Sequence, residues 1–136
     1  MSGSRLVVGC GATLLAATSL LGCGSDAKPA AEATVETYAT VPDAQVVSGL
    51  AATKQLMAAM VAAPATADQA AVDAVAASWQ TYEGNIKSTD TATYLDAEDA
   101  LALFSKAALG GDTAGMQGAA DTFSQLAAAY TAAHPG

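Results

Sequence analysis

The residues with the clearest chemical potential lie in one stretch of the chain, from Trp79 to Asp99. Three of the seven aromatic residues and five of the thirteen acids fall within these 21 residues. The aromatic residues are Trp79, Tyr82 and Tyr94, and the acids are Glu83, Asp90, Asp96, Glu98 and Asp99. Carboxylates that face one another between helices bind cations such as iron, manganese or zinc. The stretch is therefore either a ligand site or only the end of a helical hairpin.

The spacing of the two glutamates places both at the border of the predicted core. Glu83 lies about 40° from Trp79 around its helix, and Glu98 follows Tyr94 by one turn on the next helix. A turn at residues 88–90 makes these helices antiparallel, so that the levels of the two glutamates differ by only about 5 Å. Glu83 and Glu98 are therefore expected to lie near each other.

The fourth predicted helix should end at the same level, because the helices alternate in direction. It carries Tyr130 and the only histidine, His134, four residues apart on one face. A cation site would then take its ligands from Glu83 and Glu98, with His134 or a tyrosine oxygen as the third. The residues expected to line it are Trp79, Tyr82, Tyr94 and Tyr130.

A simpler interpretation of the same residues stays open. Each glutamate can be a boundary residue with a hydrated carboxylate, with Lys87 pairing to Glu83 four residues away. His134 would then be the end of a frayed helix, and the Glu-x-x-His motif of di-iron bundles is absent. Asp96 and Asp99 lie on the side of their helix that should face water.

Four segments have the apolar period of amphipathic helices, and alanine, the best helix former, dominates between them. They cover approximately residues 42–63, 66–87, 90–109 and 112–134. Short connections make consecutive helices antiparallel neighbours. The predicted fold class is therefore all-α, and the predicted architecture is an up-down-up-down four-helix bundle.

Capping chemistry sets the helix boundaries. Pro42 fits the first position of the first helix, residues 66–69 form a capping box for the second, and residues 110–111 end the third. The other N-caps are Asp90 or Thr91 for the third helix and Asp112 or Thr113 for the fourth. The predicted core residues are Val46, Leu50, Thr53, Met57, Met60, Val61, Val72, Val75, Trp79, Tyr82, Ile86, Tyr94, Ala97, Leu101, Phe104, Ala108, Met116, Ala119, Phe123, Leu126, Ala127 and Tyr130.

The N-terminal residues have the layout of a signal peptide, with Arg5 ahead of an apolar run at residues 6–21. The sequence Leu20-Leu21-Gly22-Cys23 resembles the lipobox of bacterial lipoproteins. This resemblance implies that residues 1–22 are removed and that Cys23 carries a diacylglycerol anchor. An uncleaved anchor is the alternative, but about 16 apolar residues are short for a bilayer.

The lipobox divides the chain into residues 1–22 as signal peptide, residues 23–41 as lipidated cysteine and flexible tether, and residues 42–136 as helical domain. Residues 30–41 are either disordered or form a short helix. The expected location is the cell envelope, facing the periplasm or the outside. Gly24 after the cysteine favours the outer membrane if the bacterium has two membranes.

Composition excludes several functions. With Cys10 removed and Cys23 acylated, no free thiol remains for catalysis, zinc binding or disulfide formation. Four lysines then stand against thirteen acids, a formal net charge of −9 that disfavours nucleic-acid binding. A single histidine and the lack of a Ser-His-Asp set leave no catalytic residues to predict. We therefore expect a protein that is not an enzyme.

The pattern Trp79-x-x-Tyr82-Glu83, followed by Tyr94-x-x-Ala97-Glu98, resembles the extracytoplasmic helical domain of bacterial high-affinity iron permeases. It is similar also to the periplasmic helical proteins that accompany such permeases. Ala97 replaces the isoleucine of that family, and the first helix lacks the family's further acids. The resemblance implies a metal-binding accessory of iron uptake, with an iron permease as partner. The alternative is a non-catalytic envelope lipoprotein that acts through protein–protein contacts without a bound ligand.

We predict that a Cys23→Ala variant loses its lipid and is released or retained as the precursor, because the substituted side chain has no sulfur to acylate. Metabolic labelling with palmitate and fractionation of membranes would measure this. Recovery of an acylated, membrane-bound variant would overturn the lipoprotein interpretation.

Overall fold

The computed structural model describes residues 40–135, and the regular structure in this part of the chain is entirely helical. The predicted all-α class is therefore confirmed. The helices are α1 (Asp43–Ala62), α2 (Gln69–Gln80), α3 (Glu83–Thr89), α4 (Thr91–Gly110) and α5 (Thr113–Ala133), with a 3₁₀ turn η1 (Pro64–Thr66) between α1 and α2. The predicted signal peptide, Cys23 and nearly all of the tether lie outside the described residues.

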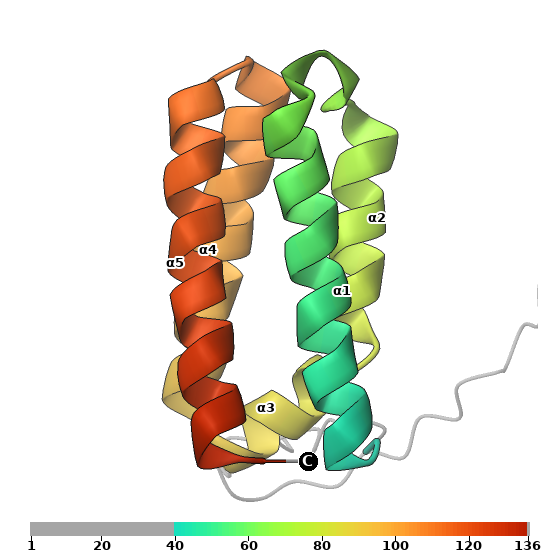
Figure 1. Cartoon of the computed structure of the whole chain (residues 1–136), viewed down its shortest axis with the longest axis vertical. Coiled ribbons are helices and arrows are strands. Elements are labelled where there is room, and N and C mark those ends of the chain that lie inside the picture. Colours follow the sequence, from blue (N-terminus) through green and yellow to red (C-terminus); the bar gives the residue numbers. More distant parts are fainter. Residues whose placement is uncertain (1–39, 136) are drawn as a thin grey trace, which may run out of the picture. The chain divides into compact units, whose positions relative to one another are not determined.

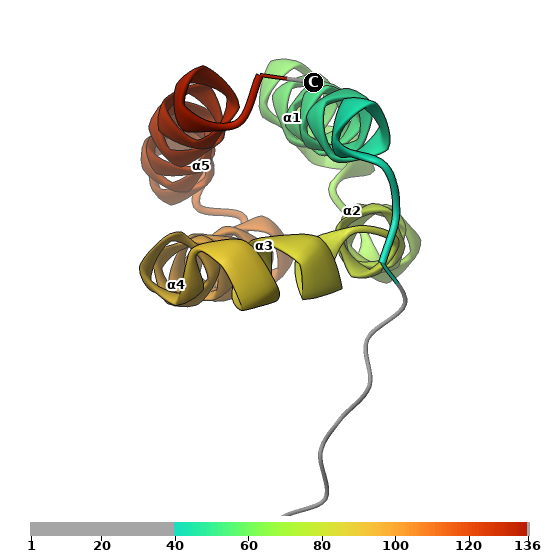
Figure 2. The same ribbon diagram turned by 90° about the horizontal axis from the view of Figure 1, so that it is seen from below.

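Four long helices lie side by side, and the short α3 crosses from α2 to α4 at the end where α1 begins and α5 ends (Figures 1 and 2). α4 packs along α5, and α1 packs against both α5 and α2. α3 packs mainly against α4. Within residues 40–135, no helix combines the length and apolarity needed to cross a membrane.

The core contains the residues that the helical period predicts. All predicted core residues are at least partly buried, and only Val61, Tyr94 and Leu126 fall short of full burial. The three methionines of the described helices, Met57, Met60 and Met116, are buried among apolar neighbours. Their packing accounts for them without any metal-binding role.

Aspartates cap three of the helices by accepting backbone hydrogen bonds, as the residue preferences for N-caps predict. The bonds are Ala71 N–H to Asp68, Thr93 N–H to Asp90 and Gly115 N–H to Asp112, at 2.9, 3.0 and 2.9 Å. Gly111 ends α4 with a left-handed φ of 70°. The capping box predicted at residues 66–69 is wrong, because the Thr66 hydroxyl donates to the Ala63 carbonyl and Asp68 is the cap. Pro42 is the N-cap of α1 and not its first residue.

The second predicted helix does not continue to Lys87. It ends at Gln80, and Tyr82 takes the non-helical conformation φ −141°, ψ −4° before α3 begins. No glycine or proline marks this break. The buried side chain of Tyr82 determines it instead, because the ring lies against Gly49 of α1 and its hydroxyl is 2.7 Å from the Thr53 hydroxyl.

The Thr53 hydroxyl is a buried polar junction between α1 and α2. It donates to the Gly49 carbonyl at 3.1 Å and lies 2.8 Å from the Ser78 hydroxyl. Since a threonine hydroxyl has one proton, Tyr82 and Ser78 are the donors toward it. Burial raises the pKa of the Tyr82 hydroxyl above its usual range, so the phenol stays neutral and keeps this bond.

Asn85 of α3 binds the segment that precedes α1. Its Nδ2 donates to the Val41 carbonyl at 2.6 Å, and the Val41 N–H donates to its Oδ1 at 2.9 Å. Two reciprocal bonds fix Val41 against α3. The end of the predicted tether is therefore ordered at residue 41, with no helix there.

We predict that Gly49→Ala lowers the free energy of unfolding by about 1–2 kcal/mol, although alanine is the better helix former. A Cβ at residue 49 would lie 2.6 Å from Cε1 of the Tyr82 ring, which is buried and held by its hydroxyl. Gly118→Ala is the matched control, because a Cβ there meets nothing within 4 Å. It should raise stability by about 0.5–1 kcal/mol. Urea unfolding followed by circular dichroism measures both, and equal stabilisation by the two substitutions would contradict the close contact.

Candidate functional site

Glu83 and Glu98 meet in a cavity of about 240 Å³ between α2, α3 and α4. Glu83 is the first residue of α3, and Glu98 lies two turns into α4. Both side chains are half-buried. The other residues that line the cavity are Val75, Ala76, Trp79, Gln80, Leu101, Ala102 and Ser105. The hairpin geometry thus brings the two glutamates together as predicted.

Trp79 forms one wall of this cavity and binds its carboxylates. Its indole N–H donates to Oε1 of Glu98. The indole is 3% exposed and contacts three aromatic rings, which hold it in place. Tyr82 and Phe123 meet it edge-on at centroid distances of 5.3 and 5.9 Å, and Tyr94 stacks on it at 6.2 Å.

The two carboxylates lie close enough for the charge of Glu98 to act on Glu83. Burial raises the pKa of Glu83, and the negative charge of Glu98 and a side-chain hydrogen bond with Glu98 raise it further. The positive charge of Lys87 and the indole of Trp79 act in the opposite direction without cancelling the rise. A hydrogen bond between two carboxyl groups requires a proton on one of them. Protonation of Glu83 would therefore remove the repulsion between the two adjacent carboxylates.

Lys87 lies beside this pair as the helical spacing predicts. Its charge acts on Glu83, and its Nζ is 5.3 Å from the centroid of the Tyr94 ring. The ring of Tyr94 therefore contacts both the indole of Trp79 and the ammonium group of Lys87. The stretch from Trp79 to Asp99 thus brings aromatic, acidic and basic side chains together where α2 and α4 meet.

His134 is not part of this set. Its ring stacks on Tyr130 at a centroid distance of 4.4 Å, and the Tyr130 hydroxyl is 2.9 Å from the Thr89 hydroxyl. Two hydrogen bonds from Thr93 lower the pKa of Asp90, and the charge of His134 lowers it further. Within residues 40–135, no three His, Cys, Asp or Glu side chains gather closely enough to hold a metal ion. The reason is the position of α5, which packs on α1 and α4 and lies across the core from α2 (Figure 2).

The remaining sequence-predicted residues divide between the site and its surroundings. Trp79 lines the cavity, Tyr94 supports Trp79, and Tyr82 lies beneath both as the core residue that ends α2. Asp96 and Asp99 are exposed, as predicted. The bond from Trp79 to Glu98 was not predicted, although a buried indole N–H needs an acceptor.

We predict that Glu98→Gln lowers the pKa of Glu83, because it removes a neighbouring charge and leaves an amide that can donate to Glu83. Asp99→Asn is the control, since it removes the same charge from an exposed position one residue away. Carboxyl carbon NMR titration measures the Glu83 pKa in each protein. A Glu83 pKa that stays unchanged in Glu98→Gln would contradict the interaction between the two carboxyl groups.

The raised pKa of Glu83 also has a consequence for stability. Its stabilising contribution is fully present below the ordinary glutamate pKa of 4.5 and is lost as the pH rises through the folded-state value. Glutamine resembles the protonated side chain of glutamate. We therefore expect the free energy of unfolding of Glu83→Gln to fall less above pH 4.5 than that of the wild type. Thermal unfolding over a pH series measures this difference, and parallel curves would contradict it.

Comparison with known proteins adds no relative to this picture. No protein-family model matches the chain, and neither does any curated protein or solved structure. The resemblance to the helical domain of iron permeases therefore rests on five residues, namely Trp79, Tyr82, Glu83, Tyr94 and Glu98. Four of them lie at one cavity or in contact with its wall, and the fifth, Tyr82, determines the helix break that positions Glu83.

Proposed function

We propose that this protein is a non-catalytic, lipid-anchored protein of the cell envelope that binds a metal cation between Glu83 and Glu98 as an accessory of iron uptake. The observation that supports this is the pair of half-buried glutamates in one cavity, where burial and the charge of Glu98 raise the pKa of Glu83. A cation at the same place would remove the same repulsion and so can compete with the proton.

The donor set suits a cation that is held and passed on. Two carboxylates are good ligands for iron or manganese, which accept oxygen donors. His134 lies away from the pair, and no third acidic or histidine side chain joins it among the described residues. The other coordination positions would therefore belong to water or to a partner protein. Such an incomplete site favours exchange over permanent storage.

The proposed partners follow from the anchor and the resemblance. The lipid on Cys23 attaches the protein to a membrane, and an iron permease or another envelope protein would receive the cation. The high negative charge of the chain favours cations near its surface and opposes association with nucleic acid.

We propose an up-down-up-down four-helix bundle for the described residues, with α3 as a crossing segment at one end. The contacts that support it form a closed series, from α1 to α2, from α2 to α4, from α4 to α5 and from α5 back to α1. Short connections at η1 and at residues 111–112 allow only antiparallel neighbours.

Protein contact without a bound ligand is the second candidate function. It is favoured by the surface of α4, where Leu95, Leu103 and Leu109 are each more than half exposed. Three exposed leucines on one helix of a small acidic protein exceed what solubility favours.

We predict that the purified chain without its signal peptide and with Cys23→Ala binds one Fe²⁺ or Mn²⁺, and that Glu83→Gln/Glu98→Gln weakens this binding by about tenfold or more. Anaerobic calorimetric titration measures the stoichiometry and the affinity. Binding should release protons at a pH near the Glu83 pKa, because the cation competes with the proton that Glu83 binds there.

The control is Asp73→Asn/Asp121→Asn, which removes two charges from exposed positions on α2 and α5. It should bind the cation as the wild type does. Equal weakening in both double variants would indicate only general attraction to an acidic surface. Absence of stoichiometric binding in the wild type would overturn the proposed function.

A further inference from the structure

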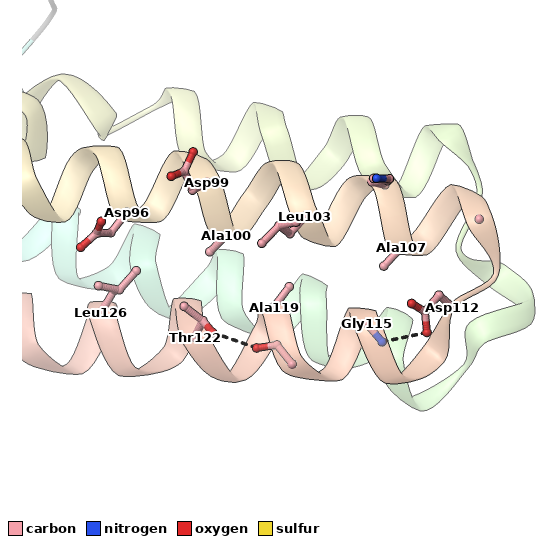
Figure 3. A pocket seen from close by; sticks show the side chains of 13 residues that line it. Asp96, Asp99, Ala100, Leu103, Ala107, Asp112, Gly115, Ala119, Thr122 and Leu126 are labelled. Atoms are coloured by element: carbon pink, nitrogen blue, oxygen red, sulfur yellow. Dashed lines mark hydrogen bonds between the residues drawn. The ribbon is translucent and has the colours of Figure 1, made fainter.

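A hollow larger than the glutamate cavity lies along the α4–α5 contact. It is a groove of about 760 Å³, and Figure 3 shows its side chains. The floor consists of small residues from both helices, among them Ala100, Ala107 and Ala119. Leu103 of α4 and Leu126 of α5 form its apolar walls. Small residues on a floor allow the backbone or bulky side chains of another element to approach closely.

Charge is distributed unevenly along this groove. Asp96 and Asp99 lie at one end and Asp112 at the other, with apolar and small residues between them (Figure 3). At 1.5 Å per residue, α4 runs roughly 21 Å, or about four turns, from Asp96 to its end at Gly110, and Asp112 follows as the N-cap of α5. Lys106 is the single basic residue among those that line the groove. The groove is thus apolar in the middle and acidic at both ends.

Leu103 is the clearest sign that this surface binds something. Its side chain is 61% exposed in the groove. An exposed leucine beside an apolar floor costs hydration free energy that a bound partner would recover, at about 25 cal/mol per Å² of apolar surface.

We propose that the α4–α5 groove binds an amphipathic helix of a partner protein that carries leucine-like residues in its centre and lysine or arginine toward both ends. The apolar stripe of such a helix would fill the floor between Leu103 and Leu126, and its basic residues would face the acids at the two ends of the groove. Charge complementarity of this kind determines the register of the bound helix and accelerates association.

A second copy of this chain fits the groove poorly. Each copy would bring its own Asp96, Asp99 and Asp112 toward those of the other, with only Lys106 as a local counter-charge. Two chains with a formal charge of −8 each also repel at a distance. A basic helix from another protein has neither disadvantage.

The probe for this proposal is a synthetic 18-residue amphipathic peptide with a leucine stripe and lysines near both ends, long enough to span the acids of the groove. We expect it to bind the full mature chain, with amide shifts in α4 and α5 that map to the groove. A peptide with the same stripe but glutamate in place of lysine should bind at least about tenfold more weakly, which tests the charge requirement.

The matched variants are Leu103→Ser and Leu109→Ser. Both residues are exposed on α4, at 61% and 53%, but only Leu103 lines the groove. The affinity for the lysine peptide should fall by about tenfold in Leu103→Ser and in Asp96→Asn/Asp99→Asn. It should stay unchanged in Leu109→Ser. Folding of each variant is checked by its circular dichroism, and exposed positions tolerate such changes.

The result that overturns the proposal is equal peptide affinity in Leu103→Ser and Leu109→Ser, or no binding to the wild type. Concentration-dependent shifts in the groove without peptide, abolished by Leu103→Ser, would assign the groove to a second copy and overturn it as well. Glu83→Gln/Glu98→Gln should weaken peptide binding far less than Asp96→Asn/Asp99→Asn does, because Glu83 and Glu98 lie outside the groove. The failure of the cation site and the failure of the groove are therefore measured separately.

Discussion

Burial of the Tyr82 ring against Gly49 is the contact on which the rest of the geometry depends. The ring occupies the space of an absent Cβ, and its hydroxyl bonds the buried Thr53. The backbone cannot continue α2 while the ring is held there, so α3 starts in a new direction. This direction places Glu83 beside Glu98 at the cavity wall. One aromatic contact with α1 therefore positions a carboxylate that α1 itself never touches.

The helical segments and most of their ends could be predicted because their causes are local. Asp90 and Asp112 cap the helices that follow them, and Gly111 takes the left-handed conformation that ends α4. The break after Gln80 could not be predicted, because no glycine or proline lies there and the helical period continues through Ile86. Its cause is a long-range contact with Gly49, which overrides the local preference for helix.

Only part of the candidate site could be predicted from the sequence, for a related reason. A hairpin determines the level of each residue along the molecule, and this placed Glu83 near Glu98 and His134 at the same end. The level of a residue along its helix does not determine which side of the helix it lies on. α5 lies across the core from α2, so His134 stacks on Tyr130 and its charge acts on Asp90. The structure brings the two glutamates together but does not bring His134 to them, so the histidine ligand has no structural support.

α4 connects the two proposed surfaces. Glu98 belongs to the cavity beside α2, and the next residue, Asp99, belongs to the groove beside α5, because successive helical residues point about 100° apart. A cation at the first surface and a basic helix at the second would both be attracted by the negative charge of α4. Two positive ligands on two sides of one helix oppose each other's binding, most strongly where they approach within about one Debye length, about 8 Å at physiological salt. A basic partner in the groove would therefore favour release of the cation, which is the direction that an accessory of uptake requires.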